Sequence, residues 1–373
     1  MPEVATQELV LNMGPQHPST HGVLRLVLRV DGEVVQEVTP HIGYMHRCAE
    51  KVGESVTYEM FTPYTDRTDY LAGMNYNLAY AVAVERLAGI QVPERAEYLR
   101  VIIAEMNRIA SHLVSFGTYG ADLGAVTPFL WAFREREMII DLFEEVCGQR
   151  LTYNYIRIGG LSADVPDGWL DKAKRFIDYF ELRIREYNDL LTFNPIFVKR
   201  TANVGVLPKE LALNYGISGP MLRASGVSWD LRRDEPYGVY PRFQFAVPVG
   251  DGRMGTVGDC WDRYYIRIRE MEESCKIIRQ ALAALPATGE ARAKLARGFK
   301  VAAGEMYVRT EGARGEIGFY IIADGNPKAY RMKIRGPSFC NLSVISEISR
   351  GAYIADLVAI LGSIDIVLCD VDR

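Results

Sequence analysis

The strongest constraint on the fold is a long amphipathic segment between Tyr264 and Leu285. Its apolar residues recur at intervals of three and four, which places them on one face of an α-helix. The residues on this face are Tyr264, Ile268, Met271, Cys275, Ile278, Leu282 and Leu285. The run RIREMEESCKIIRQAL gives the same helix a charged opposite face. Such a helix buries its apolar stripe against other elements, so we predict a helical middle region in the chain.

Three further segments have the same periodicity. One begins near Tyr70, and its clearest part carries Leu99, Ile102, Met106, Ile109 and Leu113 at helical spacing. A second runs from about 128 to 147, and a third from 170 to 191. The third is predicted to end before Asn194-Pro195, because the residue preceding a proline is pushed out of the α region.

Both ends of the chain favour β-structure. Val23 to Val30 and Glu33 to Val38 flank Asp31-Gly32, a pair suited to the two-residue turn of a β-hairpin. After Pro286, the runs MYVRTEG, GEIGFYIIADG and AYRMKIRG read as extended segments broken by glycine turns.

We therefore predict an α+β fold in which a helical core is flanked by N- and C-terminal β-containing regions. No internal repeat or long linker divides the chain, so residues 1–373 are predicted to form a single domain. Its parts are an N-terminal β region (1–45), a helical core (46–285), and a C-terminal β-containing region and tail (305–373).

Composition excludes several classes of protein. The 373 residues are 49% hydrophobic and 24% charged, typical of a folded globular chain, and the formal charge of −4 gives no field that would attract nucleic acid. The most apolar stretch, Leu357 to Leu368, is interrupted by Asp365, and no run reaches the roughly 18 residues of a membrane-spanning helix. The start, MPEVATQELV, has no signal-peptide pattern, so we expect a soluble chain on the cytosolic side. Six scattered cysteines without a CxxC pair favour reduced thiols.

One glycine motif indicates a nucleotide site only weakly. Gly250 to Gly255 spells GxGxxG between a strand-like run and the long helix. Thr256, Val257 and Gly258 delay that helix, and no strand ending in an acidic residue follows at the spacing that dinucleotide binding requires. A glycine-rich surface turn is the better interpretation, and a free-standing nicotinamide enzyme remains the alternative.

All five histidines lie within the first 112 residues. A single histidine is more often a hydrogen-bonded structural residue than a ligand. His17 and His21 share the short segment GPQHPSTHG, where prolines and glycines predict a rigid loop that can hold imidazoles in defined positions.

The segment GPQHPSTHGVLRL resembles the opening of the 49 kDa or D subunit of the respiratory NADH-quinone oxidoreductases (complex I). Other blocks of that family follow in the expected order: HIGYMHR, FREREM, YNYIRIGG, PMLRASGVSWDLR, RIREMEES, ARGEIGFY, PSFCNL and the ending ADLVAILGSIDIVLCDVDR. The resemblance therefore spans nearly the whole chain. It implies a fold like that of the related nickel-iron hydrogenase large subunits.

The hydrogenase relatives hold their metal with a tail of the form DPCxxCxxH. Here Val367 and Asp370 stand where the two thiolates would be, Arg373 replaces the histidine, and Cys369 is one position away. Nickel favours thiolate ligands, so we expect this tail to bind no nickel-iron centre and the ancestral cavity to be free for another ligand.

In the family this cavity accepts the quinone headgroup. The resemblance places His21 and Tyr70 as quinone-binding and catalytic residues, with Asp122 as the partner of the histidine and His17 as a weaker quinone-binding candidate. Tyrosine and imidazolium groups both donate hydrogen bonds and protons, as reduction of a quinone to a quinol requires. Structural roles stay open, since Tyr70 could pack in a core and Asp122 could cap a turn.

The resemblance also gives Arg314 and Arg47 as charges near the cavity or a neighbouring cluster, although a structural ion pair is equally plausible for Arg314. No redox cofactor is expected on this chain. The resemblance implies that electrons come from the 4Fe-4S cluster of the small B subunit. It further implies contacts with the C subunit, the ferredoxin-like I subunit and the membrane-embedded H subunit, and a peripheral position on the cytoplasmic side of the inner membrane.

Two alternatives within the resemblance are a non-catalytic scaffold, and the same role in a complex that takes electrons from ferredoxin. Neither the donor nor the type of quinone follows from the sequence. Residues 286–304 are shorter than expected for the family, which leaves the subunit contacts of this segment open.

Overall fold

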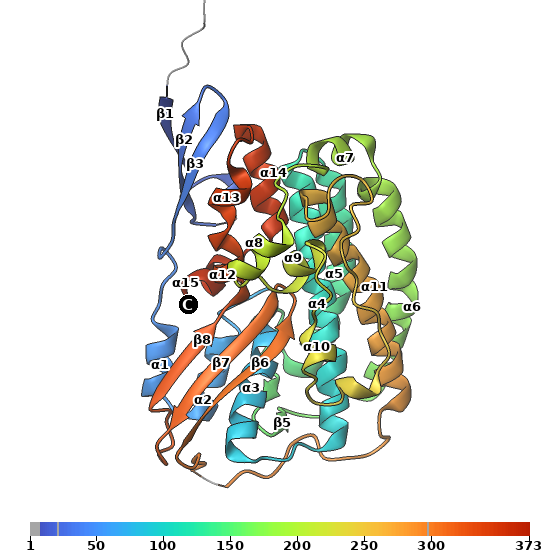
Figure 1. Cartoon of the computed structure of the whole chain (residues 1–373). Helices are drawn as coiled ribbons and strands as arrows, with labels where there is room; N and C mark the ends of the chain where they lie inside the picture. The colour runs from blue at the N-terminus through green and yellow to red at the C-terminus, as the bar shows by residue number, and fades with distance from the viewer. Residues whose placement is uncertain (1–7, 21, 297) are drawn as a thin grey trace, which may run out of the picture.

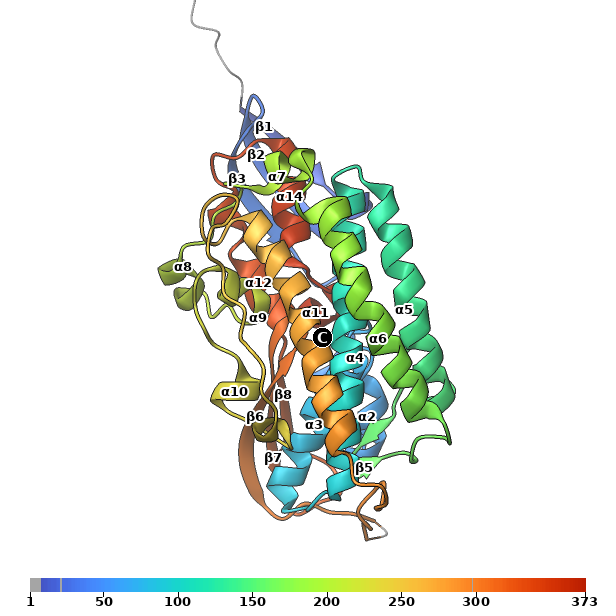
Figure 2. The same ribbon diagram turned by 90° about the vertical axis from the view of Figure 1, so that its right-hand side faces the viewer.

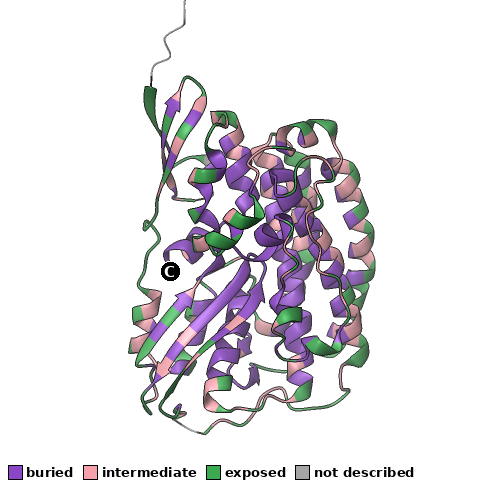
Figure 3. Cartoon of the chain, viewed as in Figure 1, coloured by how far each residue is buried: buried purple, intermediate pink, exposed green. Residues whose placement is uncertain are grey.

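A computed structural model describes residues 8–20, 22–296 and 298–373. Four long helices form the centre of the molecule and run side by side (Figures 1 and 2). They are α4 (Glu94–Asp122), α5 (Val126–Cys147), α6 (Trp169–Tyr187) and α11 (Cys260–Ala284). α4 is buried along almost its whole length, as Figure 3 shows, because other helices pack around it.

These helices confirm the periodicity of the sequence, with two differences. The third predicted helix ends as α6 at Tyr187, and its last stretch, Asn188–Thr192, widens into a π-helical turn before α7 (Pro195–Thr201). The charged face of α11 is also not a solvent face throughout. Glu270 and Glu273 on this face are buried. Glu270 pairs with Arg223, and Glu273 accepts a hydrogen bond of 2.8 Å from the backbone N–H of Ala246.

Strands β1 (Glu8–Met13), β2 (Arg25–Asp31) and β3 (Val34–His41) form an antiparallel N-terminal sheet in the order β1-β2-β3. The predicted hairpin is confirmed as β2 and β3, with Gly32 in the left-handed region at φ +60°. This sheet shares a hydrophobic core with the C-terminal helices. Their contact includes a backbone hydrogen bond of 3.0 Å from Ile354 N–H to the Glu33 carbonyl.

A second antiparallel sheet, β6-β7-β8, lies against α3 (Gly73–Ala88) and confirms the three extended segments predicted after Pro286. Its strands are β6 (Gly304–Gly312), β7 (Gly315–Ala323) and β8 (Arg331–Arg335). The chain then ends in four short helices, α12 (Pro337–Ser343), α13 (Ile345–Ser349), α14 (Ile354–Ile364) and α15 (Leu368–Asp372). The tail is therefore helical.

The remaining elements are short and connect these layers. They are α1 (Ala49–Ser55), α2 (Tyr58–Thr65), α8 (Lys209–Asn214), α9 (Gly219–Ala224), α10 (Leu231–Asp234), the two-residue strands β4 (Ile156–Arg157) and β5 (Gly160–Leu161), and 3-10 turns at Pro18–Thr20 and Tyr240–Arg242. The α+β prediction is confirmed. The division of residues 1–373 into three parts of one domain stays a prediction. Among the described helices, none has the length and apolar composition needed to cross a bilayer.

Candidate active site between the helical bundle and the C-terminal tail

A cavity of about 360 Å³ lies where three distant parts of the chain meet. It is bounded by the turn after α2, by the C-terminal half of α4 with the start of α5, and by the tail after α14. The lining residues are Tyr70, Leu71, Val114, Thr118, Ala121, Asp122, Phe129, Asp365, Ile366 and Val367. The structure therefore brings together two sequence-predicted site residues, Tyr70 and Asp122, in one mostly apolar cavity whose lining includes two aspartates.

Tyr70 lies on a short turn between α2 and α3, and 37% of its surface is exposed. The preceding residue, Asp69, shapes this turn because its Oδ1 accepts hydrogen bonds from the backbone N–H groups of Leu71 and Ala72, both at 3.2 Å. Partial burial raises the pKa of the Tyr70 phenol, and the nearby Arg314 guanidinium opposes that rise. The group therefore stays protonated at neutral pH and can donate a hydrogen bond into the cavity.

Asp122 is the last residue of α4, and it reaches the cavity because the helix ends there. The N–H of Leu123 bonds back to the carbonyls of Tyr119 and Gly120, and Gly124 then takes the left-handed conformation at φ +89°. This turn leads directly into α5, whose Phe129 forms the adjoining part of the lining.

Arg314 lies in the turn between β6 and β7, behind the cavity lining, and only 2% of it is exposed. Its NH1 donates to Asp69 Oδ2 at 2.8 Å and to Ser111 Oγ at 3.0 Å, and its Nε donates to the Asp365 carbonyl at 2.9 Å. Burial lowers its pKa, but the carboxylates of Asp365 and Asp69 outweigh this effect and raise the pKa above the ordinary value. Arg314 is therefore a fixed positive charge between the Tyr70 turn and the tail.

The remaining predicted residues have different positions. His21 lies outside the described residues. His17 is exposed, and its Nδ1 accepts a hydrogen bond of 3.2 Å from the backbone N–H of Ser19. Arg47 is exposed on the loop between β3 and α1. That loop is fixed to the tail, because Asp372 accepts hydrogen bonds from the N–H groups of Gly43 at 2.8 Å and Met45 at 2.7 Å.

The chain is similar to known proteins over nearly its full length. The family model of the respiratory-chain NADH dehydrogenase 49 kDa subunit matches residues 122–297 and 291–373. A protein of Anaeromyxobacter dehalogenans, named as a D subunit of NADH-quinone oxidoreductase, is 56% identical over 367 residues, covering 98% of this chain and 97% of the relative. The chain belongs to the family of NADH-quinone oxidoreductase D subunits. It is thus a component of the multisubunit complex I enzyme of the respiratory chain.

Further D subunits of this family are almost as similar. The protein of Chlorobium luteolum is 55% identical over 374 residues, covering 100% of this chain and 95% of the relative. The protein of Bacillus anthracis is 52% identical over 369 residues, covering 99% of this chain and all of the relative. These matches confirm the family resemblance over nearly the full length.

The tail of this D subunit packs against the rest of the fold through apolar contacts and hydrogen bonds. Val367 contributes an apolar surface to the cavity. Asp370 is buried and accepts hydrogen bonds from the Tyr76 hydroxyl and, at 2.8 Å, from the Ser338 N–H. Arg373 donates to the Ile334 carbonyl at 2.7 Å. In the described part of the chain, no cluster of three or more histidine, cysteine, aspartate or glutamate side chains is placed to hold a metal ion.

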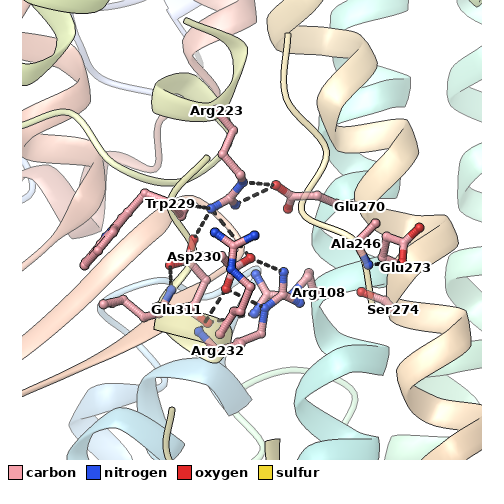
Figure 4. A network of polar contacts seen from close by, with 12 residues as sticks. Arg108, Arg223, Trp229, Asp230, Arg232, Ala246, Glu270, Glu273, Ser274 and Glu311 are labelled. Carbon is pink, nitrogen blue, oxygen red and sulfur yellow. Dashed lines mark hydrogen bonds and ion pairs between the residues drawn. The ribbon is translucent and has the colours of Figure 1, made fainter. Parts of the chain in front are cut away.

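The fold also contains a buried charge network that sequence reasoning missed (Figure 4). Its members come from five elements: Glu105 and Arg108 on α4, Arg223 on α9, Arg232 on α10 with Asp230 at its N-cap, Glu270 on α11, and Glu311 on β6. Figure 4 shows the arginines converging between these elements, and Glu270 Oε2 also lies 3.0 Å from His112 Nε2. The available signal was the spacing of Glu105, Arg108 and His112, which places all three on one face of α4.

In this D subunit, backbone N–H groups in and after the GxGxxG segment donate hydrogen bonds to a carboxylate of the same chain. The N–H groups of Gly252 and Gly258 donate to Asp262 Oδ2 at 3.1 and 3.3 Å. Asp259 caps α11 by accepting the N–H of Asp262 at 2.8 Å. Carboxylates therefore occupy the helix N-terminus where a pyrophosphate would have to bind, which supports the interpretation as a glycine-rich turn.

Proposed function

We propose that the cavity between Tyr70, Asp122 and Val367 binds the quinone headgroup, and that this chain supplies the hydrogen bonds and protons for its reduction to quinol. The observation that carries the proposal is the position of Tyr70 and Asp122 in one cavity, although they come from separate family blocks. Ile366, Val367 and Phe129 offer apolar surface to a planar ring.

Reduction of a quinone adds two electrons and two protons, so negative charge develops on the two carbonyl oxygens. The Tyr70 hydroxyl donates a hydrogen bond to one oxygen and lowers the energy of the charge that develops there. His21 is proposed as the second donor, and Asp122 as the carboxylate that favours its protonated form. His17 is assigned a weaker role in binding.

The electrons come from a partner in this proposal, the 4Fe-4S cluster of the small B subunit. The loop between β3 and α1 is the surface that we assign to that partner, because Ile42, Tyr44 and Met45 expose apolar side chains there next to Arg47. Arg47 places a positive charge on the surface assigned to the subunit that holds the cluster. Arg314 supplies a second positive charge behind the quinone cavity.

The wider assembly follows from the same proposal. Quinone is lipid-soluble, so its tail reaches the cavity through a path completed by the membrane-embedded H subunit. The C subunit and the ferredoxin-like I subunit are further proposed partners. The chain is then a peripheral component on the cytoplasmic side of the inner membrane.

Replacement of Tyr70 tests the proposal in the assembled complex. Tyr70→Phe removes the hydroxyl and keeps the ring, and it should lower kcat/KM for a short-chain quinone by about 10²-fold, the lower end of typical acid assistance. His21→Ala should have a comparable effect. Tyr330→Phe is the matched control, since Tyr330 is exposed away from the cavity lining.

Unchanged quinone reduction by an assembled Tyr70→Phe complex would refute the catalytic role and favour a non-catalytic scaffold.

Two further measurements address the electron donor and the glycine motif. Reduction by ferredoxin but not NADH would assign the chain to a ferredoxin-driven complex. Tight NADH binding by the isolated chain in equilibrium dialysis would support a nicotinamide site at the GxGxxG segment.

A further inference from the structure

Asp69 uses both carboxylate oxygens to connect the Tyr70 turn with the turn between β6 and β7. Its Oδ1 accepts the N–H groups of Leu71 and Ala72, the residues that follow Tyr70. Its Oδ2 accepts the NH1 group of Arg314 at 2.8 Å, from the turn between β6 and β7. Asp69 and Arg314 are each 2% exposed, so water does not compete for this ion pair.

Arg314 extends the connection to the opposite side of the cavity. Its Nε donates to the Asp365 carbonyl at 2.9 Å, and its NH2 donates to Asp365 Oδ1 at 3.3 Å. Asp365 lines the cavity and has left-handed backbone at φ +58°, which a non-glycine residue keeps only where its surroundings hold it.

A second arginine fixes the same part of the tail. Arg267 of α11 donates from NH1 to the Ser363 carbonyl at 2.9 Å and from NH2 to the Ile364 carbonyl at 3.1 Å. Guanidinium groups therefore satisfy the last carbonyls of α14, and a positive charge is favourable at the C-terminus of a helix. Residues Asp365 to Val367 are therefore held in place, and the Tyr70 turn is positioned relative to them.

The Tyr70 side chain is not fixed by hydrogen bonds in the way that the tail is. Among the residues that the structure describes, none hydrogen-bonds its hydroxyl group. The direction of the phenol therefore depends on the backbone of its turn, and the Asp69 carboxylate is what connects that turn to the tail.

We propose that Asp69 is the positioning residue of Tyr70: through Arg314 it holds the turn and the Asp365–Val367 segment at a fixed separation, so that the phenol hydroxyl reaches a carbonyl oxygen of a bound quinone. This inference rests on the proposed quinone site. Asp69 itself need not touch the quinone, and it does not line the cavity.

The test compares two substitutions in the same turn, in the assembled complex with a short-chain quinone. Asp69→Asn keeps an oxygen for the Leu71 and Ala72 N–H groups but removes the charge that pairs with Arg314. Asp66→Asn is the matched control, because Asp66 is a buried carboxylate that accepts the Asn154 N–H at 3.0 Å and has no contact with Arg314. We expect Asp69→Asn to raise KM by about tenfold, the effect of losing one charge-assisted hydrogen bond, and Asp66→Asn to change it less than twofold.

KM is a concentration, so it does not depend on how much complex assembles. Equal KM values for the two variants would overturn the inference. If Asp69→Asn prevents assembly, Arg314→Lys tests the same connection, since a single ammonium group keeps the charge but cannot span Asp69 and Asp365 as the guanidinium does. It should give the same rise in KM, and an unchanged KM would overturn the inference.

The double variant Tyr70→Phe/Asp69→Asn separates this inference from the proposed function. If Asp69 acts through Tyr70, the second substitution should add less than twofold to the loss in kcat/KM caused by the first. A further full tenfold loss would overturn the positioning role while the function stands. Wild-type activity of Tyr70→Phe alone would instead refute the proposed function.

Discussion

Gly362 of α14 lies directly against the ring of Tyr119 of α4. A Cβ at position 362 would stand 2.7 Å from Tyr119 Cδ2 and 3.3 Å from Asp122 Oδ2. The first separation is shorter than van der Waals contact, so α14 approaches α4 this closely only because residue 362 lacks a side chain. The position of Asp122 in the cavity lining thus depends on helix packing one turn away.

Replacing Gly362 by alanine should push α14 away from α4. We expect a loss of about 1–3 kcal/mol in the free energy of unfolding, the usual cost of overpacking, together with a raised KM for quinone. Gly304→Ala is the control, because a Cβ there would meet only Leu87 Cδ1 at 3.7 Å. Thermal denaturation and quinone kinetics of both variants measure the two effects. A Gly362→Ala protein as stable as the control would contradict this packing argument.

Tyr76→Phe should destabilise the tail. The Tyr76 hydroxyl donates to Asp370 Oδ1, and both side chains are buried, so the substitution leaves a buried acceptor short of one donor. The expected loss is about 1–3 kcal/mol of unfolding free energy. Tyr80→Phe provides a comparison, because the Tyr80 hydroxyl donates at 2.8 Å to the uncharged Tyr58 carbonyl and should cost less. Denaturant unfolding measures both losses. A larger loss for Tyr80→Phe would contradict the expectation that a hydrogen bond to a carboxylate stabilises the fold more than one to a carbonyl.

Helical periodicity predicted the bundle well because apolar residues at threes and fours report directly on a buried face. α11 begins and ends within a few residues of the predicted apolar face. The π-turn at Asn188–Thr192 was missed, since Asn194-Pro195 indicates where a helix must stop and not how its last turn is wound. The family resemblance, and not periodicity, pointed to Tyr70 and Asp122.

The buried charges could not be predicted for a different reason. Arg223 and Arg232 belong to a block for which the sequence predicts no helix or strand, and arginine is usually exposed. They are buried because each meets carboxylates that compensate its charge. Glu270 and Glu311 surround Arg223. Arg232 pairs with Glu105 of α4 and with the neighbouring Asp230. Such compensation is a property of the assembled fold. The same holds for the Asp69–Arg314 pair, which joins positions 245 residues apart.

Glu105→Gln tests the charge network through its pH dependence. Burial opposes ionisation of Glu105, but the guanidinium groups of Arg108 and Arg232 prevail and lower its pKa to about 2. A depressed pKa contributes stability that is present above the unfolded value near 4.5 and is lost as pH falls toward 2. From this shift the contribution at pH 7 is about 3 kcal/mol. We therefore expect the stability difference between wild type and variant to shrink between about pH 5 and pH 2 in urea unfolding. A difference that stays constant with pH would argue against the ion pairs as its source.

Asp66→Asn should have the opposite pH signature. Burial raises the pKa of Asp66 to about 6, although the hydrogen bond from the Asn154 N–H partly counteracts this. Between the unfolded value of 3.8 and about 6, the folded chain holds a proton that the unfolded chain has released, so stability falls as pH rises through this window. Above about pH 6 the ionised carboxylate costs about 3 kcal/mol.

The asparagine variant does not titrate, so it avoids this cost while keeping an oxygen for the Asn154 N–H. We expect the two proteins to have similar stability near pH 4 and the variant to be more stable by up to about 3 kcal/mol at pH 7. Urea unfolding of both proteins from about pH 4 to pH 7 measures the difference. Because Asp66 lies in the Tyr70 turn but does not contact Arg314, this gain in stability should leave KM for quinone nearly unchanged. A variant that is less stable than wild type at pH 7 would show that the Asp66 carboxylate is stabilised in the fold by partners that outweigh its burial.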